Sequence, residues 1–304
     1  MSSEISHEPM GVLVVNKHAG VTSHDIVSRC RKLFSTRKIG HTGTLDPMAT
    51  GVLVILVGRA VKASEYLTEH DKTYICTMRL GITTDTQDIT GHELACSEDI
   101  PDEAEVTEKI CRFIGPVTQV PPMYSALKVG GKKLVDLARR GIEIERAPRN
   151  VFIRSIETEK IDRENYRMRV ECSKGTYIRT LCADIGTALG CGAVMSSLER
   201  VASGGYTLDS SVTIDELESM GPEERQGKLL PVETAFAGLT AVSLDEKRAF
   251  SVRNGSMLGQ CDLGLDLGED ELVTLFEGKS FFALGRSVLK EDGKYIKQDK
   301  LFVI

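Results

Sequence analysis

Residues 40–53 read GHTGTLDPMATGVL, and this stretch is the most informative part of the chain. It holds one acid, Asp46, and one histidine, His41, and it runs into the apolar segment GVLVILVG (51–58). Pro47 removes a backbone donor and disfavours helix at Asp46, while the glycines admit backbone angles that other residues resist. The pattern predicts a stiff, irregular loop that presents one carboxylate and leads into a buried strand. An ordinary Asp-Pro turn before a strand is the alternative that local chemistry leaves open.

The composition is that of a soluble globular protein. The chain has 304 residues, of which 41% are hydrophobic and 27% are charged, which fits one large domain or two ordinary ones. No apolar run approaches the ~20 residues that a membrane span requires. The first ten residues, MSSEISHEPM, are polar and acidic, which argues against a targeting presequence. We therefore expect a cytoplasmic protein that does not contact a membrane.

The eight cysteines do not have the spacing of a metal site or a disulfide framework. No two of them are spaced as CxxC, and all six histidines lie within the first 92 residues. We expect reduced thiols that pack as small hydrophobic side chains. The cysteines are Cys30, Cys76, Cys96, Cys111, Cys172, Cys182, Cys191 and Cys261.

The charge is unevenly distributed along the chain. The net charge is −6, but residues 205–304 alone carry 11 basic and 18 acidic residues, so the first 204 residues are close to neutral. Within them, residues 128–149 hold seven basic and three acidic residues. This segment is a candidate nucleic-acid surface, because charges beyond a Debye length of ~8 Å are largely screened. A solvated helix face is the alternative reading of the same charges.

The hydrophobic pattern alternates between strands and helices without a regular βαβ rhythm, so we expect an α+β fold. Strands are predicted at 11–17, 51–58, 72–80, 150–161 and 166–172. Helices are predicted at 23–34, 60–67, 103–113, 134–140, 176–189 and 212–220. Residues 81–101 and 119–133 have the composition of loops, and short β-type runs after about residue 240 indicate a small β-rich C-terminal domain.

Four segments could carry chemistry: the Asp46 loop, Tyr74 in KTY (72–74), KGTYIRT (174–180) and the basic loop around Tyr124. Taken singly, each also fits an ordinary structural role. The motifs HExxH, GxxxxGK[ST] and GxSxG are absent from the sequence, so we expect no metal and no nucleotide cofactor. What remains is a single carboxylate, an arginine, tyrosines and a basic surface.

In four segments the chain resembles the TruB-type tRNA pseudouridine synthases. GHTGTLDPMATGVL matches the family pattern HxGxLDPxAxGxL, and KTY, QVPPMYSALKVGGKKLVDLARRG (119–141) and SKGTYIRTLCADIG (173–186) follow in the family's order. The resemblance implies a mixed, mainly antiparallel sheet flanked by helices and loops. It also implies a catalytic domain over 1–238, with an RNA-binding thumb at about 119–149, and a small PUA-like domain over 239–304.

The resemblance assigns roles to individual residues. Asp46 matches the family's catalytic aspartate, Tyr74 the tyrosine that stacks on the target uracil, and Arg179 the partner of the aspartate, for which we expect bidentate contact. His41 matches the histidine that helps to dislodge the target base. Further active-site positions are Tyr177, Lys17 and Leu198, and the candidate RNA-binding residues are Tyr124, Lys128, Lys132, Lys133, Arg139 and Arg140. One departure from the family is His18, where the family often has proline.

The implied reaction converts uridine 55 in the T arm of tRNA to pseudouridine. It gains and loses no atoms, so no cofactor is expected, and Asp46 can act by covalent attack or by taking the 2′ proton. The expected partner is the tRNA T stem-loop, and the protein is expected to be a monomer. An RNA-binding protein without catalysis and a guide-RNA-dependent relative are the competing hypotheses. A glycoside hydrolase would need a second positioned carboxylate, and none accompanies the loop in sequence.

Overall fold

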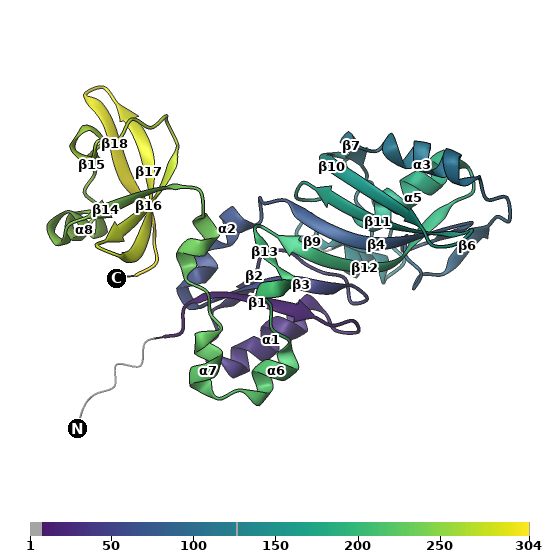
Figure 1. Ribbon diagram of the computed structural model, residues 1–304, viewed down its shortest axis with the longest axis horizontal. Coiled ribbons are helices and arrows are strands. Elements are labelled where there is room, and N and C mark those ends of the chain that lie inside the picture. Colours follow the sequence, from purple (N-terminus) through teal and green to yellow (C-terminus); the bar gives the residue numbers. More distant parts are fainter. Residues whose placement is uncertain (1–7, 126, 304) are drawn as a thin grey trace.

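The structure is a computed structural model that describes residues 8–125 and 127–303 (Figure 1). A nine-stranded sheet forms its larger part, in the order β1-β3-β12-β4-β11-β10-β7, with β2 added to β3 and β13 to β12. All pairs are antiparallel except β3 with β12. The strands are β1 (Gly11–Lys17), β2 (Ile39–His41), β3 (Thr50–Val57), β4 (Lys72–Leu80), β7 (Gly115–Gln119), β10 (Arg149–Lys160), β11 (Asn165–Cys172), β12 (Ala193–Ser203) and β13 (Tyr206–Thr207). The predicted α+β class with a mixed, mainly antiparallel sheet is confirmed.

Helices lie beside the sheet and are delimited by sequence signals. The first helix begins at a capping box in which Thr22 and Asp25 bond each other's backbone N–H groups. Helix α5 ends at Gly190, whose φ of 80° is the left-handed value that favours glycine. The helices of this part are α1 (Ser23–Leu33), α2 (Ser64–Leu67), α3 (Glu103–Cys111), α4 (Leu134–Ala138), α5 (Ile178–Leu189), α6 (Ile214–Ser219) and α7 (Pro222–Gly227).

Strands β1 and β3 are buried on both faces, which explains their unbroken apolar sequences. On one face, Leu13 and Leu53 join the main core with α1 and α5. On the other face, Val14 and Val54 join a second core that includes Phe236. The Asp46 loop (40–50) therefore enters β3 at a point enclosed by two hydrophobic layers.

A second, five-stranded sheet forms the C-terminal part, drawn in yellow and green in Figure 1. Its order is β14-β16-β17-β18-β15, and it confirms the predicted β-rich C-terminal region. Aromatic rings join it to the larger part: the Phe236 ring centroid lies 5.5 Å from that of Tyr66 and 5.7 Å from that of Phe302. The elements are β14 (Thr240–Leu244), α8 (Glu246–Arg253), β15 (Leu258–Gly259), β16 (Leu272–Glu277), β17 (Ser280–Lys290) and β18 (Gly293–Leu301).

Several elements differ from the sequence-based expectation. The predicted loop at 81–101 contains a hairpin of β5 (Ile82–Thr84) and β6 (Glu93–Cys96), and the predicted loop at 119–133 contains β8 (Lys128–Val129) and β9 (Lys132–Lys133). The predicted helix at 60–67 is a 3-10 helix, Gly58–Ala63, followed by the single turn of α2. Strand β12 was not predicted, because its mixed polar sequence lacks a clear two-residue period. No helix within the described ranges is long and apolar enough to cross a membrane.

Candidate active site

The loop before β3 is held in place from both sides, as the sequence predicted. The Ser23 hydroxyl accepts a 2.8 Å hydrogen bond from Leu45 N–H and donates a 3.0 Å bond to the Leu45 carbonyl. After the acid, the Pro47 carbonyl accepts bonds from Gly20 N–H at 2.8 Å and from Lys17 Nζ at 3.2 Å. Asp46 is thus fixed between two anchored neighbours, and its side chain keeps 30% exposure.

Arg179, in the first turn of α5, is the cation beside Asp46. Its side chain is 5% exposed, and its Nη2 lies 3.3 Å from both Asp46 carboxylate oxygens. The expected two-nitrogen, bidentate pairing is wrong, because Nη2 alone makes the contact and also donates a 2.6 Å bond to the Tyr124 carbonyl. Nη1 instead lies 3.8 Å from an oxygen of Asp88. The guanidinium therefore links the loop, the basic segment and the β5–β6 hairpin.

Asp88 is a second carboxylate that the sequence did not reveal at this site. It is 4% exposed, and its Oδ1 accepts bonds from Thr90 N–H at 2.9 Å, Thr90 Oγ1 at 2.6 Å and Thr86 Oγ1 at 2.9 Å. The expectation of a single carboxylate is therefore corrected: Arg179 lies between two. The donors around Asp88 occupy one of its oxygens. The Asp46 side chain is the more exposed of the two carboxylates, at 30% against 6%.

Burial raises the pKa of Asp46 above its usual value, against the opposing effect of Arg179. The charge of Asp88 raises this pKa further, and Lys17 lowers it. A carboxylate with a raised pKa is a better base or nucleophile than an exposed one, provided that it remains ionised.

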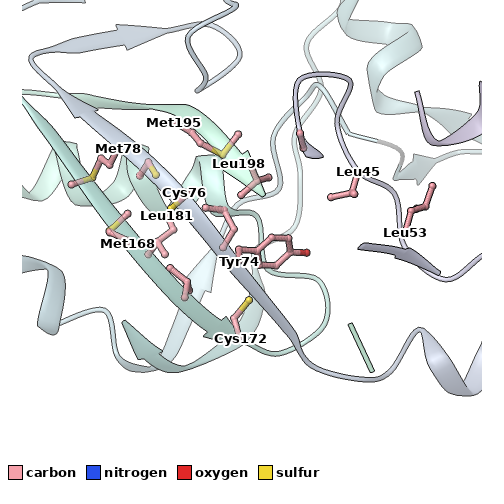
Figure 2. Close-up of a cluster of buried hydrophobic side chains, with 14 of the residues drawn as sticks. Leu45, Leu53, Tyr74, Cys76, Met78, Met168, Cys172, Leu181, Met195 and Leu198 are labelled. Carbon is pink, nitrogen blue, oxygen red and sulfur yellow. The ribbon is translucent and has the colours of Figure 1, made fainter. Parts of the chain in front are cut away.

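Tyr74 and Leu198 lie together in the apolar wall next to the loop. Figure 2 shows both in one cluster with Leu45, on β4, β12 and the loop respectively. Tyr74 is 8% exposed, and burial raises the pKa of its hydroxyl. The structure therefore brings these two predicted residues into one apolar surface with Leu45 of the Asp46 loop.

Lys17 is fully buried, and its bonding partners among the described residues are all backbone carbonyls. Its Nζ donates to the carbonyls of His18 at 3.0 Å, Val21 at 2.9 Å and Pro47 at 3.2 Å. Burial lowers its pKa to about 8, although the nearby Asp46 charge opposes the shift. Lys17 therefore anchors the loop rather than reaching the solvent, and the exposed His18 bonds the Ala19 carbonyl instead.

His41 ends β2 at the start of the loop. Its Nδ1 is buried without a hydrogen-bond partner among the described residues, and burial lowers the pKa of the ring. Loss of charge by the ring is therefore favoured at this position.

Tyr177 is positioned by Gln119, a residue that the sequence did not single out. The buried Gln119 accepts a 3.0 Å bond from Tyr177 N–H and donates a 3.2 Å bond to the Tyr177 carbonyl. Tyr177 is the N-cap of α5 and makes no side-chain capping bond. The carboxamide therefore fixes the start of the helix that carries Arg179.

Arg200, on β12, is a further candidate residue of this site that the sequence did not single out. It is 2% exposed, and it donates from Nε to the Val52 carbonyl at 2.7 Å and from Nη2 to the Gly43 carbonyl at 3.0 Å. It also pairs with Tyr74 in the β4–β12 register. The only signal in the sequence is its position two residues after Leu198.

The basic segment forms a small separate unit. Met123, Leu134 and Leu137 make its apolar centre, and the Tyr124 carbonyl reaches Arg179. The side chains of Lys132, Arg139 and Arg140 are exposed. The predicted Lys128 and Lys133 side chains lie outside what the structure describes.

An open cleft of about 490 Å³ adjoins the site, with Met48 and Leu198 among its lining residues. Ile75 and Thr77 also line it, and they alternate along β4 with the buried Tyr74. Much of this cleft therefore lies on the sheet face opposite the main core. Within residues 8–125 and 127–303, no three His, Cys, Asp or Glu side chains are grouped as a metal site requires.

Family profiles and curated relatives match most of the chain. The profile of the TruB family pseudouridylate synthase N-terminal domain matches residues 31–178, and that of the tRNA pseudouridylate synthase B C-terminal domain matches residues 179–237. The tRNA pseudouridine synthase B of Clostridium kluyveri is 40% identical over 96% of this chain and 99% of its own length. That of Bacillus pumilus is 44% identical over 88% of this chain and 89% of its own.

Solved structures give the same result for the fold. The crystal structure of a Cbf5-Nop10-Gar1 complex contains a chain that aligns with a TM-score of 0.74 and 26% identity, over 98% of this chain and 86% of that one. A second Cbf5 structure, with Nop10, has a TM-score of 0.71 at 23% identity and shows the fold alone. The profiles span most of the chain and the relatives nearly all of it: the chain belongs to the TruB family of pseudouridylate synthases.

Proposed function

We propose that this protein isomerises uridine 55 in the T arm of tRNA to pseudouridine, with Asp46 as the catalytic carboxylate. The proposal rests on the surroundings of Asp46, whose side chain is 30% exposed and contacts the buried Arg179. Tyr74 and Leu198 form an apolar surface next to the loop that carries it. The names of the relatives, tRNA pseudouridine synthase B, support tRNA as the substrate.

The reaction breaks the N1–C1′ bond of the uridine and forms a C5–C1′ bond, while the C5 proton is lost and N1 gains one. Atoms and electrons balance without an external oxidant or reductant, so the proposal includes no cofactor. Asp46 can add to the nucleotide and later leave, or it can take the 2′ proton and return it. The raised pKa of Asp46 favours both roles, because a more basic carboxylate is a stronger nucleophile and a stronger base.

The uridine must leave its stack to reach Asp46. Extrusion costs a few kcal/mol, and stacking on an aromatic ring recovers about 1–3 kcal/mol per base. Tyr74 is proposed as that ring, with Leu198 as the apolar contact and His41 as the group that displaces the base. Tyr177 completes the proposed site beside Arg179.

The remaining predictions belong to the same proposal. The exposed Lys132, Arg139 and Arg140, with Tyr124, Lys128 and Lys133, are proposed to bind RNA phosphates. We propose that residues 1–238 form the catalytic domain and 239–304 a PUA-like domain, and that the protein acts as a monomer in the cytoplasm.

The test is conversion of a tRNA transcript by the purified protein in the presence of EDTA and without nucleotides. Pseudouridine is expected at position 55 and is detected by carbodiimide modification and primer extension. Asp46→Asn, which keeps the size of the side chain, is expected to bind the transcript and form no pseudouridine. Normal turnover by this variant, or modification at another position only, would contradict the proposal. A transcript with cytidine at position 55 is the matched substrate control.

A further inference from the structure

Arg200 joins three parts of the site that are distant in sequence. Its side chain bonds the carbonyl of Gly43 in the catalytic loop and that of Val52 in β3. Its backbone is opposite Gly51 in the parallel pairing with β3 and opposite Tyr74 in the antiparallel pairing with β4. Arg200 is therefore the point at which the loop, β3 and the strand carrying Tyr74 meet.

The packing around Arg200 leaves little freedom. A Cβ built on Gly51 would lie 2.3 Å from the Arg200 carbonyl oxygen, and one built on Gly43 would lie 3.4 Å from Nη1. The Arg200 backbone therefore packs against Gly51, and its guanidinium packs against Gly43. The burial of a cation is costly unless its donors are satisfied. The carbonyls of Gly43 and Val52 accept from the buried guanidinium, and the Tyr74 hydroxyl lies within its hydrogen-bonding reach.

This charge also acts on the neighbouring groups. It lowers the pKa of Lys17, of Lys72 and of His41, in each case adding to the effect of burial. At Tyr74 it opposes the effect of burial. Lys17 and His41 flank the Asp46 loop and Tyr74 packs beside it, so the guanidinium lies within electrostatic reach of these three groups of the site.

We propose that Arg200 is a positioning residue that fixes the spacing between the loop carrying Asp46 and the strand carrying Tyr74. The inference rests on the proposed function, in which Asp46 and Tyr74 act on the same uridine. A planar guanidinium holds its donors on separate nitrogens in a rigid fork, so Nε reaches the Val52 carbonyl while Nη2 reaches that of Gly43, whereas the three donors of a lysine ammonium share one nitrogen. Displacement of a reacting group by about 1 Å costs about 100-fold in rate.

The decisive variant is Arg200→Lys, which keeps the charge and removes the two-directional bonding. Its single-turnover rate on the tRNA transcript is expected to fall about 100-fold, with the tRNA Kd unchanged within about threefold. Arg79→Lys is the matched control, because Arg79 is an exposed arginine on β4 that pairs with Glu164 at 3.3 Å. A normal rate in Arg200→Lys, or losses of rate and affinity of equal size, would overturn the proposal.

A second measurement does not depend on activity. Hydrogen exchange of the peptide covering residues 40–50, read by mass spectrometry, is expected to be faster in Arg200→Lys than in the unaltered protein and in Arg79→Lys. Equal exchange would overturn the positioning role. If the unaltered protein forms no pseudouridine, the proposed function fails, while the exchange measurement still decides whether Arg200 holds the loop.

A variant on the loop side covers the case in which Arg200→Lys does not fold. Gly43→Val crowds Nη1 without altering Arg200 itself, and the same split between rate and affinity is expected. A folded Gly43→Val protein with normal rate and normal exchange would count against the proposal.

Discussion

Arg179 contacts both carboxylate oxygens of Asp46 through one nitrogen, with Nη2 3.3 Å from Oδ1 and from Oδ2. The same nitrogen makes a shorter, 2.6 Å bond to the Tyr124 carbonyl. Asp88 lies 3.8 Å from the other terminal nitrogen. The carboxylates of Asp46 and Asp88 and the carbonyl of Tyr124 thus share one guanidinium group. The orientation of the Arg179 guanidinium is therefore set by Tyr124 and Asp88 as much as by Asp46.

Arg179→Lys is expected to abolish most turnover. An ammonium group offers one point charge and does not span Asp46, Tyr124 and Asp88 together. The single-turnover rate is expected to fall at least about 100-fold, because Asp46 loses both its partner and its direction. Binding of tRNA, measured by filter retention, is expected to stay within about threefold. Loss of binding with an unchanged rate would show that Arg179 serves the RNA and not the carboxylate.

Asp88→Asn is expected to move the acid side of the pH–rate profile. Burial and the Asp88 charge raise the pKa of Asp46, whereas Arg179 lowers it. Removal of the Asp88 charge therefore lowers the pKa of Asp46, so the carboxylate stays ionised to a lower pH. The rate of the variant is expected to begin to fall at a lower pH than that of the unaltered protein. If the acid side of the pH–rate profile stays in place or moves to higher pH, the Asp88 charge does not raise the pKa of Asp46.

The control for this shift is Asp85→Asn. Asp85 lies in the same hairpin and is exposed, and its carboxylate accepts a bond from His92 N–H at 2.8 Å. Its charge is not among those that affect the pKa of Asp46. The acid limb of Asp85→Asn is expected to coincide with that of the unaltered protein.

Local sequence patterns predicted those parts of the fold that depend on local chemistry. Strands at 11–17 and 72–80 have the predicted bounds, and the Asp46 loop is irregular and anchored as expected. The pairing of Asp46 with Arg179 could be anticipated only through the resemblance to a family. Nothing in the spacing of two residues so far apart in the chain indicates a contact.

The missed features depend on tertiary contacts. Strand β12 reads AVMSSLERVAS, and two bulges in its pairing with β4 break the alternation that identifies a strand. Arginine side chains are mostly exposed, so the sequence favours a surface position for Arg200. The carbonyls of Gly43 and Val52 allow its burial instead. Asp88 lies in a segment with the composition of a loop. Its proximity to Arg179 follows from hydrogen bonds between this segment and β12, such as that from Ile89 N–H to the Met195 carbonyl.

Gln119→Leu is expected to loosen the start of α5. The substitution removes the 3.0 Å partner of the Tyr177 N–H, whereas the Tyr177 carbonyl loses its 3.2 Å bond but still accepts one from Leu181 N–H at 3.0 Å. A buried polar group left unpaired costs about 1–3 kcal/mol, so the free energy of unfolding in urea is expected to fall by that amount. The rate is expected to fall as well, since Arg179 follows two residues later. Gln226→Leu, at an exposed position in α7, is the control and is expected to change neither quantity.

Phe236→Ala is expected to weaken the junction between the two sheets. The Phe236 side chain is 5% exposed and touches the rings of Tyr66, Phe281 and Phe302. Truncation of a buried phenylalanine costs about 3–5 kcal/mol, which calorimetry would record as a large fall in Tm. Phe250→Ala removes a ring that is 66% exposed on α8 and is expected to leave Tm nearly unchanged. Equal effects of the two substitutions would show that the aromatic cluster does not stabilise the junction.

Gly51→Ala and Gly20→Ala separate backbone strain from steric contact at the start of β3. Both glycines have left-handed backbone angles, with φ of +98° and +89°, so each substitution carries a strain of about 1–3 kcal/mol. An added Cβ at Gly20 meets nothing within 4 Å, but at Gly51 it lies 2.3 Å from the backbone oxygen of Arg200. Because backbone does not move aside as a flexible side chain does, Gly51→Ala is expected to lose at least about 2 kcal/mol more in urea unfolding. Equal losses would mean that β3 and β12 separate without cost at Arg200, and the close packing of these two strands would then not hold the Asp46 loop in place.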